Sequence, residues 1–579
     1  MKFVTAIMLP VVLTAAVPVL AASENGHAGK AGASKTAAPA PLPGSASDTD
    51  FFRCDGYAAP KGKVDGISQE SFIFGGTRSA DIRRGEMWIW GETGVAACDR
   101  ALADARLIDA FWLRRANLIQ AKALHSIAAN RPEQALTLTT ESGALGAAHD
   151  DRYFTQSIGA GNEGVRAYAL IATGRKDEAK AAIDRLRTGR PFAQSIQQLA
   201  TRLQLHLDAS FSGQSQEIRN VIPLSPEKAG SLFWMHFLHG NYAEARAIAP
   251  VVSFDLPKQR GGWTLHGADQ NVLDGIGLRS TFYGAWAYAD TVTGHNDHAA
   301  SLLTEANAEV EEIMAPPQPR SDGRPPKKKN VEEYERRLPY ARKAKDELAL
   351  WKAAINFRPR VTIQPIGETH SAFLKMRLDT LPIAPDILMN VPQENPAEKA
   401  EAQTALASIR NRLEAERIAA LDFPVKDVIA LLPRPETPKV VPRLKPAGDG
   451  YFLSASGLTR DREGKSDIWT IRYTHLLAPI AAVEELAMLG AALTAKKEGY
   501  DSLLLLSRIG IARTTNVTSY YGGGYQQNSG YESQMRVRFL NASAIPQELQ
   551  GMEWRLIPAQ RVIDELANRY TEGGITIAW

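Results

Sequence analysis

Five helix-breaking positions punctuate the Ala- and Leu-rich part of this chain, and they constrain its fold more than any other feature. Each places a Gly or Asn five residues before an Ala, in the fragments GETGVA, NRPEQA, GRKDEA, GNYAEA and GHNDHA. The pairs are Gly91 and Ala96, Asn130 and Ala135, Gly174 and Ala179, Gly240 and Ala245, and Gly294 and Ala299. Gly and Asn tolerate the left-handed backbone that ends a helix, and Ala lets the next helix pack closely. Because strong helix formers fill the segments between them, the pattern predicts an antiparallel helical array.

These turns resemble the turn between the two helices of a tetratricopeptide repeat. In three of the five cases a second small residue stands seven positions before the turn, where that family also has one: Ala123, Ala167 and Ala287. Arg84 and Phe233 stand there in the other two. From Gly91 to Gly294, successive turns are 39, 44, 66 and 54 residues apart, against a family period of about 34. The resemblance implies an irregular tetratricopeptide-like solenoid with a concave groove for a peptide or protein. A generic helical bundle is the alternative.

The first residues, MKFVTAIMLPVVLTAAVPVLAAS, predict export. One basic residue, an apolar run and small residues at the end are typical of a secretory signal peptide, here residues 1–22. A retained anchor is the alternative, but two prolines interrupt the run. Residues 23–50 are rich in Ala, Gly, Pro and Ser and predict a disordered linker. Since no later stretch approaches the roughly 20 apolar residues of a transmembrane helix, we expect a periplasmic or secreted protein without a membrane span after cleavage.

Only two cysteines occur, Cys54 and Cys98, and both lie in the first part of the mature chain. In an oxidising compartment such an isolated pair is more often a disulfide than a metal or catalytic site. We therefore expect a disulfide, with two reduced buried thiols as the alternative. The bond would close a loop of about 44 residues and would contribute on the order of 4 kcal/mol in the chain-entropy model.

Composition divides the rest of the chain. Residues 51–430 form the predicted helical region, interrupted at 315–329 by an exposed Pro- and Lys-rich loop, APPQPRSDGRPPKKK. This basic loop either is simply solvated or meets an anionic surface. Residues 431–449 repeat Pro among charges and predict a semi-rigid linker. The 67 basic and 64 acidic residues nearly cancel, which gives no general case for nucleic-acid binding.

Residues 450–579 differ from the helical region in their hydrophobic pattern. The segment QMRVRFL alternates apolar and polar residues, as a strand with one covered face does, and SDIWTIRYTHLL and DSLLLLSRIGIARTTNVTSYY also predict strands. Amphipathic helices are expected in PIAAVEELAMLGAALTAKKEGY and PAQRVIDELANRY. We predict a mainly helical protein whose solenoid is followed by a smaller α+β domain with an antiparallel sheet. The order of these last elements resembles small uncharacterised exported domains of alphaproteobacteria, a resemblance that implies no activity.

Tyrosines and glycines are interleaved in residues 519–534, SYYGGGYQQNSGYESQ. On a flexible loop, Tyr520, Tyr521, Tyr525 and Tyr531 can stack on sugar rings or anchor a partner protein. The alternative is a plain hairpin tip, made flexible by three consecutive glycines.

Two histidine pairs raise the question of a metal site. His236 and His239, like His295 and His298, are spaced so that a helix would place both on one face. A metal needs three or four ligands, however, and Gly294 puts His295 in a turn. We therefore predict no metal site unless all four imidazoles converge in space. No hydrolase, phosphate-loop or dinucleotide motif occurs in its proper context, so neither a catalytic residue nor a cofactor is predicted.

Together these features favour an exported, non-enzymatic scaffold that binds a protein or peptide of the cell envelope in a helical groove. Two alternatives stay open: an envelope hydrolase with a site between the helical region and the C-terminal domain, and a polysaccharide or envelope-polymer binder. Converging carboxylates or histidines with perturbed pKa values would favour the enzyme, whereas an extended apolar groove would favour the scaffold. The sequence identifies neither the partner nor the oligomeric state.

Overall fold

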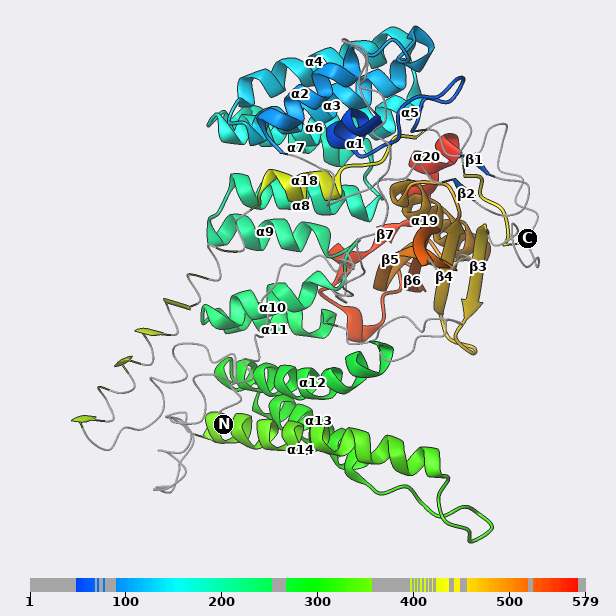
Figure 1. Cartoon of the computed structure of the whole chain (residues 1–579). Coiled ribbons are helices and arrows are strands. Elements are labelled where there is room, and N and C mark those ends of the chain that lie inside the picture. Colours follow the sequence, from blue (N-terminus) through cyan, green and yellow to red (C-terminus); the bar gives the residue numbers. More distant parts are fainter. Residues whose placement is uncertain are drawn as a thin grey trace, which may run out of the picture. The chain divides into compact units, whose positions relative to one another are not determined.

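In the computed structural model of the chain, the structure describes residues 48–67, 70–71, 77–78, 90–252, 267–356, 423–436, 442–447, 456–518 and 524–570, with scattered positions between 396 and 419 (Figure 1). The predicted signal peptide and nearly all of the predicted linker lie outside these residues. Contacts divide the chain into two compact units. One contains the described residues of Thr14–Ser225 and Leu421–Trp579, and the other contains those of Pro226–Ala420.

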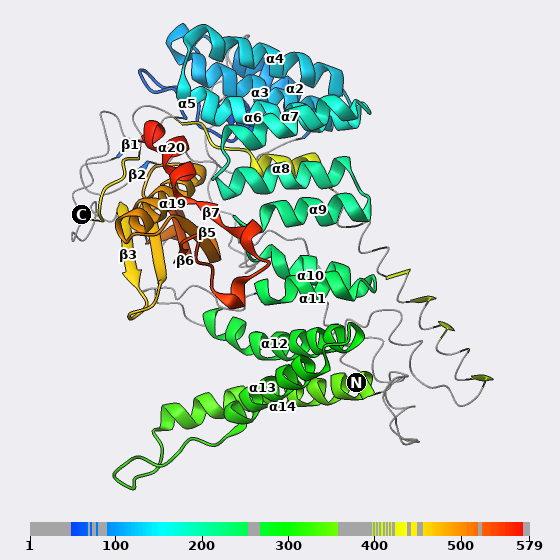
Figure 2. The ribbon, with the colours of Figure 1, turned by 180° about the vertical axis from the view of Figure 1, so that it is seen from behind.

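The first unit opens with antiparallel helices stacked in pairs. The helices are α1 Asp48–Asp55, α2 Glu92–Leu102, α3 Trp112–Ala128, α4 Pro132–His149, α5 Arg152–Phe154, α6 Ala160–Ala172, α7 Lys176–Gly189, α8 Gln194–Leu207 and α9 Phe211–Val221. Helix α3 packs on α4, α6 on α7 and α8 on α9, and α4 also contacts α6, so that successive pairs form a layered array (Figures 1 and 2). Alanine and branched aliphatic residues line the shared interior.

Four helix connections share one backbone geometry. Asn130, Gly174, Gly240 and Gly294 have φ values of 60°, 74°, 76° and 86°. In each, the next N–H donates to the carbonyl five residues earlier: Arg131 to Ser126 at 2.8 Å, Arg175 to Leu170 at 2.9 Å, Asn241 to His236 at 2.9 Å and His295 to Asp290 at 2.8 Å. A left-handed residue with this six-residue hydrogen bond is the Schellman arrangement, which satisfies carbonyls at a helix end. The same local chemistry therefore closes four helices in both units.

The alanines after the turns are buried in four of the five cases. Ala135, Ala179 and Ala245 are fully buried and Ala299 is 3% exposed. The preceding small residues Ala123, Ala167 and Ala287 are also fully buried. The first fragment differs: Ala96 is exposed, and Gly91 precedes α2 rather than joining two described helices. Val95 is buried there in place of Ala96.

One helix connection uses other chemistry. Between α8 and α9, the carboxylate of Asp208 accepts the N–H of Ser210 at 2.9 Å, and the Ser210 hydroxyl accepts the N–H of Gly213 at 3.1 Å. Ser210 is thus an N-cap, which satisfies a donor at the start of α9. A search for Gly or Asn before Ala misses this helix pair.

A five-stranded antiparallel sheet forms the C-terminal domain, in the order β3-β4-β6-β5-β7. The strands are β3 Gly457–Arg462, β4 Ile468–His475, β5 Ser502–Thr518, β6 Gly524–Leu540 and β7 Ile557–Pro558. On β6, Met535, Val537 and Phe539 are fully buried beneath the helices. The alternate residues form ion pairs, Arg536 with Glu463 at 2.7 Å and Arg538 with Asp467 at 2.8 Å. The sheet therefore has one apolar and one charged face, as the alternation in QMRVRFL predicts.

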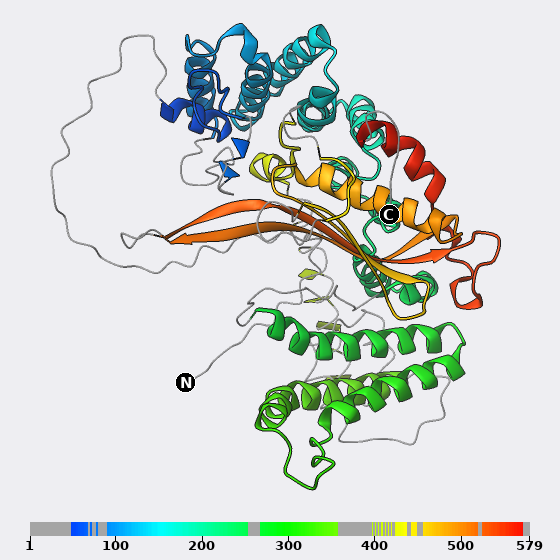
Figure 3. The same ribbon diagram turned by 90° about the vertical axis from the view of Figure 1, so that its right-hand side faces the viewer.

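Helix α19, Ile480–Lys497, packs on the buried face of this sheet (Figure 3). The sequence predicts an amphipathic helix, but α19 is buried on nearly every side from Ala481 to Ala495. The difference arises because α8 of the helical array and α20, Ala559–Tyr570, cover the side of α19 that faces away from the sheet. A helix that is apolar all round is typical of such a central position.

The second unit contains the helix pair α10 Lys228–Leu238 and α11 Tyr242–Ile248, followed by α12 Gly267–Val292, α13 Asn296–Met314 and α14 Lys328–Asn356. Aromatic rings fill its centre: Phe233, Phe237, Tyr288 and Trp351 are essentially inaccessible to solvent. The Pro- and Lys-rich loop predicted at 315–329 runs from Ala315 to Lys327 with nearly all its residues exposed, and α14 begins at Lys328.

The predicted fold class is confirmed: the described chain is mainly helical and ends in an α+β domain with an antiparallel sheet. The compact units, however, do not follow the boundary near residue 430 that the sequence suggests. The first helices and the terminal sheet belong to one unit, because the segment after Leu421 returns to pack against α3, α6 and α8.

Candidate protein-interaction site

Residues Phe423–Glu436, which we call the strap, lie on the helical array of the first unit (Figures 1 and 2). Helix α18, Val425–Leu431, packs on α3 and α8, and the strap then continues without regular structure to Glu436. Its first part falls in the predicted helical region and the remainder in the predicted 431–449 linker. The array instead holds it much as a groove would hold a peptide.

Phe423 anchors the start of the strap. Its ring is buried, with the Tyr168 and His206 rings edge-on at centroid distances of 6.1 and 6.4 Å. The Tyr168 hydroxyl donates to the Phe423 carbonyl at 2.8 Å, and the Arg202 guanidinium lies 5.3 Å above the Phe423 ring. Burial lowers the pKa of Arg202, although Asp427 on the strap opposes that shift. Aromatic, hydrogen-bond and cation–π contacts thus converge on one side chain.

Aliphatic contacts continue along α18. Val428 is fully buried in the cluster formed by α3, α4, α6, α7 and α8, and Leu432 packs on the same cluster. A Cβ added to Gly164 of α6 would lie 3.1 Å from Leu199 Cδ2 and 3.6 Å from Leu432 Cδ2. A side chain at position 164 would therefore crowd Leu199 of α8 and would meet the strap at an ordinary contact distance. Burying a side chain such as Phe423 or Val428 contributes about 1.5–3 kcal/mol.

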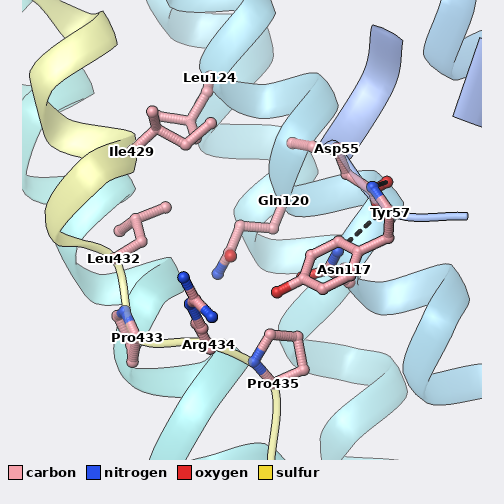
Figure 4. A pocket seen from close by; sticks show the side chains of 11 residues that line it. Asp55, Tyr57, Asn117, Gln120, Leu124, Ile429, Leu432, Pro433, Arg434 and Pro435 are labelled. Atoms are coloured by element: carbon pink, nitrogen blue, oxygen red, sulfur yellow. Dashed lines mark hydrogen bonds between the residues drawn. The ribbon is translucent and has the colours of Figure 1, made fainter. Parts of the chain in front are cut away.

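A small pocket of about 40 Å³ lies where the strap meets α1 and α3 (Figure 4). Its lining comprises Asp55, Tyr57, Asn117, Gln120, Ala121, Leu124, Ile429, Leu432, Pro433, Arg434 and Pro435. The side chains of Tyr57, Gln120 and Arg434 point into it. A space of this size suits ordered water or a group of a few atoms, and not a large substrate.

The pocket contains one carboxylate that is paired and one arginine that, among the described residues, is not paired with a carboxylate. The buried Asp55 carboxylate accepts from Arg114 at 2.5 Å, from the Asn117 amide at 2.6 Å and from the Tyr57 N–H at 3.1 Å. Burial raises the pKa of Asp55, while Arg114 and these hydrogen bonds oppose the rise. Arg434 stacks on the Tyr531 ring at 5.1 Å, and within the described residues no carboxylate pairs with it. Arg434 is therefore the pocket's uncompensated charge.

The end of the strap enters a buried ionic cluster, which we call the junction: Arg190, Glu436, Glu485, Arg569 and Tyr570. Arg190 is fully buried and donates to Glu436 Oε1 at 2.6 Å, to both Glu485 oxygens at 3.1 and 2.8 Å, to the Tyr570 hydroxyl at 3.1 Å and to the Gln156 carbonyl at 3.0 Å. These contacts use every donor group of the guanidinium. Four chain segments that are far apart in sequence are thereby joined.

Glu485 is held as a carboxylate. Arg569 adds a second guanidinium at 2.7 Å, and the Tyr570 hydroxyl also donates to Glu485. Although burial opposes it, Arg190 and Arg569 lower the pKa of Glu485. Burial and the nearby Glu485 charge raise the pKa of Tyr570. Perturbed pKa values occur at active sites and in structural ion-pair networks; because all five junction side chains are mutually satisfied and nearly all are closed to solvent, this cluster is structural.

The neighbouring Glu484 links the array to the terminal domain in another way. Its carboxylate accepts the Ser195 N–H at 2.9 Å and the Ser195 hydroxyl at 2.8 Å, at the first turn of α8. An acidic side chain at a helix N-terminus is stabilising. Burial raises the pKa of Glu484, and Arg508 and Ser195 oppose the rise. Glu484 thus attaches α19 to α8 beside the junction.

The other predicted site residues lie elsewhere. Cys54 and Cys98 form a disulfide between α1 and α2, and both are fully buried. Tyr531 lies in β6, opposite His475, and is 8% exposed, so it is not on a loop; its expected role in an interaction stays a prediction. Tyr525 lies in β6, opposite Val517. Tyr520 and Tyr521 lie outside the described residues.

The histidines also differ in environment. His236 is buried, and His239 Nδ1 lies 2.8 Å from the Met235 carbonyl. His295 Nδ1 lies 3.1 Å from the Thr293 hydroxyl in the turn, whereas His298 Nδ1 lies 2.5 Å from Asp290 Oδ2. Across the described part of the chain, no three His, Cys, Asp or Glu side chains gather as a metal site would require.

Arg246 of α11 completes the environment of His298. Its Nε donates to the other oxygen of Asp290 at 2.8 Å, and Asp290 is fully buried in α12. Asp290 therefore ties α11, α12 and α13 together. His298 is half exposed, and its ring lies 5.3 Å from Trp286.

No protein-family model, curated protein or solved structure matches this chain. The fold and the strap alone define its class: a layered helical array that carries an α+β domain and holds one of its own segments. Within the described ranges, no helix has the length and apolar composition needed to span a bilayer.

Neither the strap nor the junction is predicted by the sequence patterns described above. The run FPVKDVIALLP places Val428 and Leu432 four residues apart, as one face of a helix does, and this apolar density before a Pro-rich segment was a usable signal. Arg190 had no such signal, because its partners lie up to 380 residues away.

Proposed function

We propose that this protein is an exported, non-enzymatic interaction scaffold whose helical array binds peptide segments on the face formed by α3, α6 and α8. The single observation that carries the proposal is the strap. A segment with an aromatic anchor, a short amphipathic helix and a Pro-rich extension already occupies this face. Helix-in-groove recognition uses apolar anchors in this way.

The chemistry of the strap supports a partner that presents matching groups. The aromatic ring of Phe423 packs against the Tyr168 and His206 rings. Two aliphatic residues, Val428 and Leu432, follow along the helix, and the Glu436 carboxylate pairs with Arg190. We therefore expect the partner to be an envelope protein that presents this order of groups in an exposed segment. The exported location in this proposal rests on the signal-peptide pattern of residues 1–22.

The proposal also accounts for an irregular array. Stacked helix pairs expose an extended surface whose ligand specificity depends on side chains and not on the repeat period. The Schellman turns fix the pairs, while Gly164 and Tyr168 contact the strap and shape the face.

A binding measurement tests the proposal. A fluorescent peptide with the sequence of residues 421–436 is titrated into the full-length wild-type chain and into the full-length Phe423→Ala variant. The attached strap competes at a millimolar effective concentration in the wild type. Weakening the strap in the variant should therefore improve peptide affinity about tenfold or more, since each 1.4 kcal/mol changes an equilibrium tenfold.

Two controls make the result specific. Phe111→Ala removes the same side chain from the separate cluster around the disulfide and should leave peptide binding as weak as in the wild type. A peptide that itself carries Phe423→Ala should bind neither variant. Failure of the wild-type peptide to bind the Phe423→Ala chain, while its helical circular dichroism is retained, would contradict the proposal.

A further inference from the structure

The two longest strands extend beyond the rest of the sheet (Figure 3). Strand β4 pairs with β6 from Ile468 opposite Arg538 only as far as His475 opposite Tyr531. Past that point β5 and β6 continue as a two-stranded ribbon, from Thr514 opposite Asn528 to Thr518 opposite Gly524. We call this ribbon, Thr514–Thr518 with Gly524–Asn528, the arm.

A change of register separates the arm from the sheet. The pairing of β5 with β6 shifts between Ala512 and Thr514, where the ladder is irregular. Gly530 lies in the same place with φ +110°, and a Cβ there would lie 2.3 Å from the His475 carbonyl oxygen. Glycine is therefore required where β6 leaves the end of β4. The arm therefore begins at a register shift and at a glycine that the backbone geometry requires.

The outer edge of β5 is open along the arm. Strand β7 pairs with β5 only at Ser502 and Leu503. Among the strands that the structure describes, none pairs with β5 on that side beyond Leu503. An isolated two-stranded hairpin is marginally stable in water, and an open edge is a template for another strand. The arm thus lacks the third strand that would stabilise it.

The arm lacks the charged residues and prolines that usually prevent an edge strand from pairing with another chain. From Thr514 to Tyr531, 18 residues contain no Asp, Glu, Lys, Arg or Pro. At the chain's 23% of charged residues, a segment of this length would hold about four. Natural edge strands normally carry charges or proline that block pairing with another chain. Here that protection is absent along the open edge.

The uncharged sequence favours one particular partner, a second copy of this chain. In a two-fold antiparallel pair of identical strands, the residue on the axis faces its own copy. Any charge there would meet a like charge directly opposite, which is destabilising. An uncharged arm therefore avoids like-charge contacts with its own copy, whereas an arm that selects another protein gains specificity from charge.

We propose that the β5 edges of two arms pair antiparallel around a two-fold axis, so that two copies of the protein form a dimer through one continuous sheet. The main-chain hydrogen bonds of the paired arms supply the attraction. This interface is separate from the strap-binding face and does not depend on the peptide-binding proposal.

Charge substitutions test the pairing directly. Asn516 lies at the centre of the β5 half of the arm, opposite Gln526. Full-length wild-type, Asn516→Lys and Asn516→Glu chains are compared by analytical ultracentrifugation over a range of concentrations. The wild type should sediment as a dimer and each variant as a monomer. An equimolar mixture of the two variants should recover the dimer, because Lys then faces Glu.

The mixture also excludes misfolding as the cause of dissociation, since unfolded chains would not recover the dimer. Ala181→Lys, which adds the same charge to an exposed position of α7, should remain dimeric. A wild type that is monomeric at every soluble concentration overturns the proposal. So does a dimer that Asn516→Lys leaves intact, or a pair of monomeric variants whose mixture fails to associate.

Discussion

The helix turns and the junction hold the first unit together by opposite means. At a turn such as Gly174, one left-handed residue and hydrogen bonds spanning six positions close the helix. At the junction, Arg190 contacts side chains that are 246, 295 and 380 residues away. The turns are numerous and individually weak, whereas the junction is single and buried. We therefore expect a change at the junction to cost far more stability than a change at a turn.

The largest effect should follow from removing Arg190. Arg190→Met leaves the buried Glu436 carboxylate without its cation and leaves Glu485 with Arg569 alone. Breaking a buried pair in this way costs about 3–5 kcal/mol. Urea unfolding of the full chain followed by circular dichroism measures the loss. Arg175→Met is the matched control, because its partners Glu178 and Glu133 are exposed and little or no change is expected. Equal effects at the two arginines would remove the distinction between junction and turn.

The disulfide should come next. Cys54 and Cys98 are 44 residues apart, and opening that loop removes about 4 kcal/mol in the chain-entropy model. We expect a Cys54→Ala, Cys98→Ala double variant to unfold at a lower urea concentration than the oxidised wild type. Reductant should lower the wild-type midpoint in the same way and leave the double variant unchanged. A midpoint insensitive to both treatments would show that α1 needs no covalent link to α2.

A pH-dependent effect should arise at the end of β4. His475 Nδ1 accepts the N–H groups of Leu477 and Ala478 at 3.1 and 2.8 Å, so the ring must be neutral. Burial, with a smaller contribution from Lys445, lowers the pKa of His475 from 6.5 to about 4. Between those pH values the unfolded chain binds the proton and the folded chain does not. Stability is therefore lost as the pH falls through this window, by up to about 3 kcal/mol.

His475→Asn isolates this contribution, because an amide oxygen can accept the same N–H groups and does not titrate. Urea midpoints at pH 7 and pH 4.5 should differ less for the variant than for the wild type. An unchanged difference would assign the acid sensitivity to other groups.

The smallest effect should be at a turn. Gly174 has φ 74°, and a Cβ there would meet nothing within 4 Å, so Gly174→Ala costs only the left-handed backbone of an L-residue, about 1–2 kcal/mol. Gly143 offers the opposite case. It lies inside α4, and its Cβ would also meet nothing, so Gly143→Ala should stabilise by about 0.5–1 kcal/mol. Thermal unfolding of both variants should show shifts of opposite sign; shifts of the same sign would contradict the local account of the turns.

The helix turns and the junction also differ in how far the sequence predicts them. The turns were predictable because Gly174 and Ala179 act through residues within six positions of each other. The alternation around Val537 predicted the sheet for the same reason. Ala96 and the α8–α9 connection departed from the pattern, since Val95 and the Ser210 cap supply the packing and capping there by other residues.

The strap and junction could not be placed in this way. Phe423 and Arg190 carry ordinary local sequence, and their roles depend on which distant segments they meet. The glycine-rich sequence around Tyr531 suggested a loop or a hairpin tip, whereas cross-strand pairing extends β6 back to Gly524. The environments of these residues depend on long-range contacts, and no periodic pattern in the sequence predicts such contacts.

The central claim is that the face on α3, α6 and α8 is formed by the array itself and that the strap only occupies it. Hydrogen–deuterium exchange of the full-length Phe423→Ala variant tests this most directly. We predict faster exchange for the amides of α18, while the interior amides of α6 and α8 keep their wild-type protection. Loss of protection in α6 and α8 together with α18 would contradict the claim, because the strap would then be part of the core that the array needs in order to fold.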